Sequence, residues 1–190
     1  MRIQGGAYRG RTIKTVEGPG YRPATAKVRE AAFNMLHARG LVFEGLRVAD
    51  LFAGSGSLGI EALSRGADFA LFVEMNRKAA AMLRENLRSM GIEPACWRIE
   101  AKDLFSVLKT RHVEPFGLVF IDPPYGKDLL EPALALALDK GWAAPGAFIL
   151  AEVEASLDTA ALDGLPGLDL ETDRTYGQTR ILLWRTTDPA

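Results

Sequence analysis

Residues 46–59 read LRVADLFAGSGSLG, and this stretch decides the fold. An apolar run ends at Asp50, a turn rich in glycine carries Gly54, Gly56 and Gly59, and a helical pattern begins directly after them. The order of strand, glycine turn and helix lets the backbone approach a ligand closely and points helix N–H groups at it. The stretch therefore predicts a strand of an α/β domain with a ligand site at its carboxyl end.

The glycine turn by itself is compatible with two cofactors. Its G-x-G-x-x-G spacing matches the dinucleotide fingerprint, and Glu74 follows Gly54 by 20 residues, where an acid that binds a ribose is expected. Asp50 argues against a nicotinamide cofactor, because a carboxylate just ahead of the glycines is out of place beside a pyrophosphate. S-adenosylmethionine has an amino group, a sulfonium and a ribose but no phosphate, so a carboxylate suits it there. A nicotinamide-dependent oxidoreductase stays as the weaker alternative.

The rest of the chain alternates between strand and helix patterns. Strands are predicted at residues 46–52, 69–74, 95–99, 118–122 and 147–153, and helices at 57–65, 76–90, 104–109 and 129–140. Alternating βα units imply a parallel sheet with helices on both faces. Two more strands, 168–175 and 179–185, flank a hairpin signal at 176–178 and predict an antiparallel edge. The fold class is therefore α/β and Rossmann-like, with a mostly parallel seven-stranded sheet.

The amino-terminal residues differ from the rest in charge. Residues 1–29 hold seven basic side chains against Glu17, a net charge of +6, which leaves −7 for residues 30–190. Two strand-like runs at 1–4 and 11–16 predict a small β-hairpin, and a helix is expected at 25–39 with Thr25 as its N-cap. A basic arm suggests a polyanionic partner, although a solvated positive surface is the alternative. We therefore read residues 1–24 as a basic extension that binds nucleic acid. The candidate nucleic-acid contacts in it and in the helix that follows are Arg2, Tyr8, Arg9, Arg11, Lys14, Arg22 and Arg29.

A second motif, Asp122-Pro123-Pro124-Tyr125, comes directly after the apolar run at 117–121. Consecutive prolines cannot continue a helix or donate to a ladder, so the chain leaves the sheet in a rigid loop. The loop offers a carboxylate, a backbone carbonyl and a flat ring. These groups suit a planar heterocycle with an exocyclic amine, because the oxygens accept the amine hydrogens and the ring stacks on the base. We interpret all four residues as catalytic; a plain strand end is the alternative.

The composition is typical of a globular protein and argues against a membrane-spanning or metal-binding one. The chain has 190 residues, of which 48% are hydrophobic, and no apolar stretch approaches the roughly 18 residues of a membrane span. Cys96 is the one cysteine, and the two histidines, His37 and His112, lie far apart without ligand spacing. We expect a monomer in the reducing cytoplasm, with no metal site and no membrane association.

With these residues in place, the whole chain resembles the bacterial 16S ribosomal RNA (guanine-N2)-methyltransferase family, which are class I S-adenosylmethionine-dependent enzymes. The glycine and Asp-Pro-Pro-Tyr motifs are common to amino methyltransferases. The elements YRGR at residues 8–11 and R-P-x-T-x-x-V-R-E at residues 22–30 are more specific to the family. The resemblance implies that residues 25–190 form a methyltransferase domain and that the product is a guanine methylated at N2 in ribosomal RNA, either naked or within an assembled small subunit.

The resemblance also assigns a cofactor site. Glu74 is expected to hold the ribose hydroxyls and Met75 to pack on the adenine. Asp103 is expected to accept from the adenine amine, with a helix N-cap as its alternative role. The full expected set is Asp50, Phe52, Ala53, Gly54, Ser55, Gly56, Glu74, Met75 and Asp103. Three alternatives stay open at this point: methylation of adenine N6, methylation of a protein glutamine, and a noncatalytic RNA-binding protein.

Overall fold

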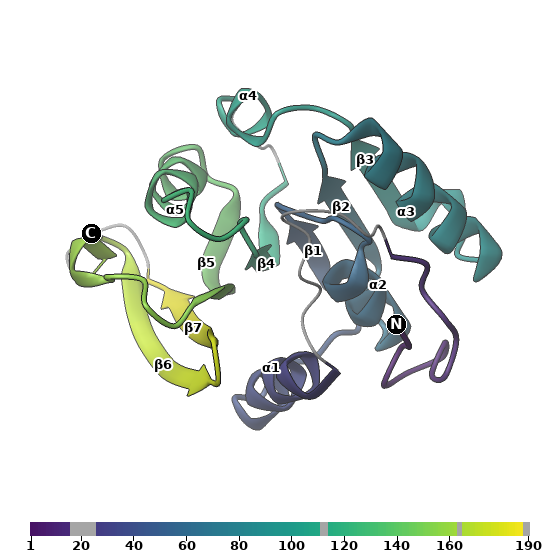
Figure 1. The fold of residues 1–190 in the computed structure, drawn as a ribbon, viewed down its shortest axis with the longest axis horizontal. Helices are drawn as coiled ribbons and strands as arrows, with labels where there is room; N and C mark the ends of the chain where they lie inside the picture. The colour runs from purple at the N-terminus through teal and green to yellow at the C-terminus, as the bar shows by residue number, and fades with distance from the viewer. Residues whose placement is uncertain (16–25, 111–113, 163–164, 188–190) are drawn as a thin grey trace.

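The computed structural model describes residues 1–15, 26–110, 114–162 and 165–187, and its centre is one seven-stranded sheet of order β3-β2-β1-β4-β5-β7-β6 (Figure 1). The strands are β1 (Arg47–Asp50), β2 (Phe69–Val73), β3 (Trp97–Glu100), β4 (Phe116–Ile121), β5 (Ala143–Glu154), β6 (Leu168–Tyr176) and β7 (Thr179–Thr186). β1 to β5 are mutually parallel, whereas β7 pairs antiparallel with β5 and β6 antiparallel with β7. The predicted Rossmann-like sheet with an antiparallel carboxyl-terminal edge is confirmed.

Helices cover both faces of this sheet, as predicted (Figure 1). They are α1 (Ala26–Ala38), α2 (Ser57–Ser64), α3 (Arg77–Ser89), α4 (Leu104–Leu108) and α5 (Leu130–Asp139), with short 3₁₀ turns at Pro94–Cys96 and Ala160–Leu162. Because successive strand residues point to opposite faces, Phe120 packs with α1, α2 and α3, while its neighbour Val119 packs with α4 and α5. The sheet therefore separates two apolar clusters.

The carboxyl ends of the parallel strands lie at one edge of the sheet. Backbone hydrogen bonds continue the pairing just beyond the strands, from Leu51 N to Phe120 O at 3.0 Å and from Ala53 N to Val73 O at 3.0 Å. Glu74 N likewise donates to Glu100 O at 3.1 Å. The loops that follow β1, β2 and β4 therefore start side by side, and this is the edge where open α/β sheets bind ligands.

The amino-terminal segment, residues 1–15, differs from the predicted hairpin. It has a single antiparallel bridge, between Arg2 and Thr12, in place of two regular strands. The physical reason is that α2 takes up the backbone groups of the turn: Ala7 N donates to Ser64 O at 2.7 Å, and Tyr8 N to Ser64 Oγ at 2.9 Å. The expected boundary at residue 24, and Thr25 as an N-cap, lie outside the described residues.

The same segment also contributes to the main core. Ile3 and Ile13 are almost completely buried and belong to the apolar cluster of α1, α2 and α3. Gly6 has φ +75°, and a Cβ there would lie 1.6 Å from Ser64 O, so a larger residue would force the turn away from α2. The segment is therefore packed as part of the domain.

Candidate active site

The glycine turn joins β1 to α2 and is closed by Asp50. Gly56 has φ +79° directly before α2, and a Cβ there would lie 2.2 Å from Leu83 Cδ1. Asp50 is buried, and its Oδ2 accepts a hydrogen bond from Gly59 N at 3.0 Å. Burial raises the pKa of Asp50 to about 7; the bond from Gly59 opposes this rise and the charge of Glu74 adds to it. A carboxylate thus already faces the first turn of α2, which disfavours the pyrophosphate of a dinucleotide there.

Glu74 connects the turn after β1 to the turn after β2. Its Oε2 accepts from Gly54 N at 2.8 Å and its Oε1 from Asn76 N at 2.7 Å, and the residue is 8% exposed. A carboxylate offers about four acceptor positions, so one lone pair on each oxygen is left for a hydroxyl. Met75 beside it is 70% exposed. The predicted contacts of Glu74 with the ribose and of Met75 with the adenine are compatible with this geometry and remain predictions.

The other expected cofactor residues lie at the same sheet edge or near it. Ala53 is buried and Phe52 and Ser55 are half-buried, and Ser55 O accepts from the side chain of Asn86 at 3.2 Å. Asp103 is exposed and is the N-cap of α4, because its Oδ1 accepts from Ser106 N at 2.9 Å and from Ser106 Oγ at 3.0 Å. The capping role of Asp103 is therefore present, and its contact with adenine remains a prediction.

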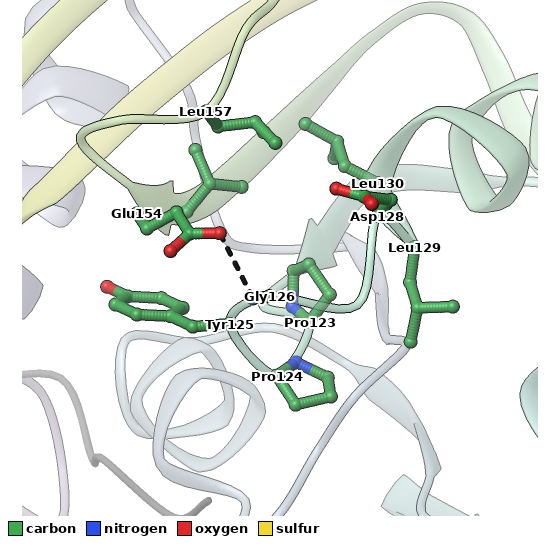
Figure 2. Close-up of a pocket in the computed structure, with 10 residues that line it drawn as sticks. Pro123, Pro124, Tyr125, Gly126, Asp128, Leu129, Leu130, Glu154 and Leu157 are labelled. Atoms are coloured by element: carbon green, nitrogen blue, oxygen red, sulfur yellow. Dashed lines mark hydrogen bonds between the residues drawn. The ribbon is translucent and has the colours of Figure 1, made fainter.

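The Asp122–Tyr125 loop leaves the sheet at the end of β4 and is fixed to β5 and β7. Glu154 at the end of β5 accepts from Gly126 N at 3.0 Å (Figure 2). The Tyr125 hydroxyl lies 3.1 Å from Thr179 Oγ1. Pro124 is exposed, whereas Asp122 and Tyr125 are half-buried. A pocket opens beside the loop, lined by Pro123, Pro124, Tyr125, Gly126, Asp128, Leu129, Leu130, Val153, Glu154 and Leu157 (Figure 2).

Carboxyl groups of three strands gather behind this loop. Burial raises the pKa of Asp122 well above its ordinary range, and the charges of Glu152 and Asp50 add to the rise. Burial also raises the pKa of Glu152 on β5 to about 7, which the charge of Arg29 opposes. The site can thus hold protons near neutral pH, and N–H donors or a cation close by would favour the ionised forms.

The candidate RNA contacts divide into surface and interior residues. Arg2 and Arg9 are exposed, and Tyr8 is half-buried with the Arg11 guanidinium 5.8 Å from its ring. Arg11 donates to Met90 O at 2.8 Å, and Lys14 forms a surface ion pair with Glu85 at 3.3 Å. Arg22 lies outside the described residues.

Arg29 corrects the expected set, because it is completely buried (0% exposed) and cannot contact RNA in this structure. Its guanidinium donates to Arg2 O at 2.6 Å and lies 3.9 Å from Glu61 Oε2. From sequence alone, an arginine in a helix is read as a surface residue because of its charge. Only the buried groups that it binds show that it lies inside. Arg29 therefore joins α1 to the amino-terminal segment and α2.

Sequence reasoning missed three polar residues that hold the amino-terminal segment or lie at the site. Glu61 of α2 is fully buried and accepts from Gln4 N and Gly5 N, both at 2.8 Å. Asn86 of α3 accepts from Lys14 N at 2.9 Å and donates to Lys14 O as well as Ser55 O. Glu152 is the third. The available signal was an acid or amide among apolar helix or strand residues, as in GIEALS and ILAEVE.

In the described parts of the chain, no group of three or more His, Cys, Asp and Glu side chains is placed to hold a metal ion. Over the same residues, every helix is too short or too polar to cross a bilayer.

Comparisons with known proteins agree with this geometry. The model of the family described as "Conserved hypothetical protein 95" matches residues 1–185. The chain is 36% identical over 189 residues to "Ribosomal RNA small subunit methyltransferase D" of Escherichia coli (strain K12), covering 97% of this chain and 89% of that protein. A protein of the same name from Haemophilus influenzae is 36% identical over 155 residues, 81% of this chain and 79% of that protein.

A solved structure gives the same result for the fold. "Putative methyltransferase yhhF from Escherichia coli" superposes with a TM-score of 0.83 at 35% identity, covering 98% of each chain. The strand order and the glycine turn agree with this likeness, and S-adenosylmethionine is the cofactor of this class of methyltransferase. The contacts of Glu74 and Met75 with that cofactor remain predictions. The chain therefore belongs to the "Conserved hypothetical protein 95" family and is a methyltransferase of the class I fold.

Proposed function

We propose that this protein transfers a methyl group from S-adenosylmethionine to the exocyclic N2 amine of a guanine in small-subunit ribosomal RNA. The observation that carries the proposal is the Asp122–Tyr125 loop, which lies on the same sheet edge as the glycine turn and Glu74. The relatives named as ribosomal RNA small subunit methyltransferases support the RNA class. The choice of a guanine amine as the methyl acceptor is inferred from the resemblance of the sequence motifs to those of the guanine-N2 methyltransferase family.

The chemistry requires orientation of a weak nucleophile. The lone pair of a guanine amine is delocalised into the ring, so the amine must be turned and its hydrogens held. Asp122 and the Pro123 carbonyl accept those two hydrogens, and Tyr125 stacks on the extruded base. When bound, S-adenosylmethionine supplies the methyl group, so that the new nitrogen–carbon bond forms as the sulfonium–carbon bond breaks and the amine loses one proton. The Asp122 carboxylate is placed to accept that proton.

The loop contacts explain how these groups keep their places. The bond from Gly126 N to Glu154 ties the loop to β5, and the contact between Tyr125 and Thr179 fixes the tyrosine against β7. Two prolines stiffen the intervening backbone. The acceptors are thus fixed before the base arrives, which lowers the cost of orienting it.

The test is methyl transfer from tritiated S-adenosylmethionine to small-subunit RNA from a strain that lacks the enzyme. Naked RNA and assembled small subunits are compared, and the modified nucleoside is identified by mass spectrometry. We expect N2-methylguanosine at one position. N6-methyladenosine or labelled glutamine would replace the proposed acceptor, and no transfer to either form of RNA would contradict the RNA substrate.

A cofactor titration separates the classes of enzyme. Saturable binding of S-adenosylmethionine without binding of NADH is expected from the position of Asp50 against α2. Binding without transfer to any RNA would favour the noncatalytic RNA-binding alternative.

A further inference from the structure

Glu152 is a buried carboxyl group beside the proposed acceptor of the amine. In the parallel pairing of β4 with β5, Ile121 lies opposite Ala151, so Asp122 and Glu152 follow at the same level on strands about 4.8 Å apart. Phe120 and Leu150, two residues earlier, both face the α1 cluster, and the alternation places Asp122 and Glu152 on that face too. The two carboxyl groups are therefore neighbours on one side of the sheet.

Within the residues that the structure describes, the acceptor capacity of both carboxyl groups is open. Among the residues that the structure describes, neither Asp122 nor Glu152 takes part in a hydrogen bond or an ion pair within 4.0 Å, although Glu152 is only 5% exposed. Asp122 is half-buried, and the carboxyl oxygens of both residues keep some contact with solvent, so they are accessible to a ligand. The charge of Arg29 on α1 acts on Glu152, while the ion pair of Arg29, at 3.9 Å, is with Glu61. The two carboxyl groups thus form an acceptor pair that a ligand with two adjacent N–H donors would satisfy.

The edge of a guanine has that pattern. Its N1–H lies beside the N2 amine, so the base offers two neighbouring donors. Adenine places the unprotonated N1, an acceptor, beside its N6 amine, and a glutamine amide has no second donor next to its nitrogen. An unpaired acceptor facing another acceptor costs binding energy, so a second carboxylate discriminates between these amines.

We propose that Glu152 determines the base specificity of this site by accepting the N1–H of guanine while Asp122 accepts from the adjacent N2 amine. This inference rests on the proposed function, because it presumes a guanine at the loop. The raised pKa values of Asp122 and Glu152 agree with this proposal. Without a ligand the two carboxyl groups retain protons, and hydrogen bonds from two N–H donors would favour their ionised forms. Glu152 thus determines specificity, and Asp122 accepts the hydrogen bond from the reacting amine.

The test compares guanine with 2-aminopurine at the modified position of the RNA. 2-Aminopurine keeps the amine at C2, but its N1 is an acceptor without a hydrogen. We expect the wild-type protein to methylate 2-aminopurine with a kcat/KM about 100-fold or more below that for guanine. Glu152→Gln can donate an amide N–H to that N1, so we expect the preference for guanine to shrink by about tenfold or more.

The matched control is Glu154→Gln on the same strand, where the carboxyl group already accepts from Gly126 N. It should lower the rate for both bases by a similar factor and leave their ratio unchanged. Two results would overturn the proposal: equal wild-type rates for guanine and 2-aminopurine, or a ratio in Glu152→Gln that equals the wild-type ratio. The first needs no variant. Absence of N2-methylguanosine with the wild-type protein would instead contradict the proposed function itself.

Discussion

Asp122 is the side chain on which methyl transfer depends most directly. It follows β4 immediately, on the substrate side of the glycine turn, and its pKa is raised by burial and by Glu152 and Asp50. We expect Asp122→Ala to lower kcat by a factor on the order of 10² or more, because loss of a charge-assisted hydrogen bond to the reacting amine costs about 2–4 kcal/mol of barrier. Single-turnover transfer of tritium measures the change.

The same variant should leave the cofactor site intact. Asp122 makes no hydrogen bond to Gly54 or Glu74, so its replacement should change the affinity for S-adenosylmethionine by no more than a few-fold, as calorimetry can show. Near-normal turnover of Asp122→Ala would remove the residue from the mechanism.

Glu74 is predicted to act on the binding of S-adenosylmethionine, not on the RNA base. Glu74→Ala should weaken S-adenosylmethionine binding by roughly 1.5–3 kcal/mol through loss of the ribose hydrogen bonds. The variant also frees the backbone N–H groups of Gly54 and Asn76, so part of the loss comes from a looser turn. Calorimetry gives the affinity, and a thermal melt without cofactor separates the two causes. An unchanged affinity would leave Glu74 with a purely structural role.

Among the elements, the amino-terminal segment is the one whose role the structure redefines. Arg9, Arg11 and Lys14 are exposed, while the backbone of the segment is held by Glu61, Ser64 and Asn86. Replacing the three cations with alanine should therefore leave the segment docked and the cofactor affinity unchanged. RNA affinity should fall, and the slope of log affinity against log salt should flatten by about 0.7–0.9 for each phosphate that the protein no longer neutralises.

A matched triple variant of α3, in which Arg77, Lys78 and Arg88 become alanine, removes the same charge from exposed positions of a neighbouring helix. If both triple variants flatten the slope equally, the effect is one of overall charge. If the amino-terminal variant keeps the parent's slope, its cations form only a solvated surface.

Most elements could be predicted because their signals are local. The βα alternation between residues 46 and 153, and the Tyr176-Gly177-Gln178 turn, each specify structure within a few residues, and the observed elements begin and end close to the predicted positions. The turn that follows Gly5 could not be predicted in the same way. Its backbone N–H groups bond to residues of α2 more than 50 positions away in the chain. A distant partner therefore shapes the turn, while Arg2 and Thr12 still pair across the segment.

The same limit applied to the site. Asp50, Glu74 and Asp122 could be found because each stands at the end of an apolar run, where a strand must stop. Arg29 and Glu152 differ from surface charges only through neighbours on other elements, namely Glu61 for the first and Asp122 for the second. Sequence spacing carries no information about such long-range partners.

At the scale of the whole molecule, buried carboxyl groups give stability an unusual dependence on pH. In the folded protein the pKa values of Asp50 and Glu152 are about 7, against ordinary values of 3.8 and 4.5. Between about pH 4.5 and 7 the unfolded chain is ionised while the folded groups stay protonated, so rising pH favours unfolding. We expect the free energy of unfolding without cofactor to fall by a few kcal/mol across this window and to level off above it.

Urea titrations at several pH values test this expectation, with Asp50→Asn and Glu152→Gln as variants whose curves should be flatter. Glu100 and Asp173 have lowered pKa values, so their stabilisation is lost only on acidification below their ordinary ranges and does not overlap this window. Stability that rises between pH 5 and 7 would contradict the inferred burial of charge.

The docked amino-terminal segment has a consequence for the order in which the protein is made. The bonds that hold residues 4–14 end on Glu61, Ser64, Asn86 and Met90. A growing chain cannot complete them until α3 has been synthesised, so the segment cannot dock before residues 61–90 have been made. In a nascent chain that ends before residue 90, the cationic residues 4–14 therefore lack part of the contacts that hold them in the finished protein.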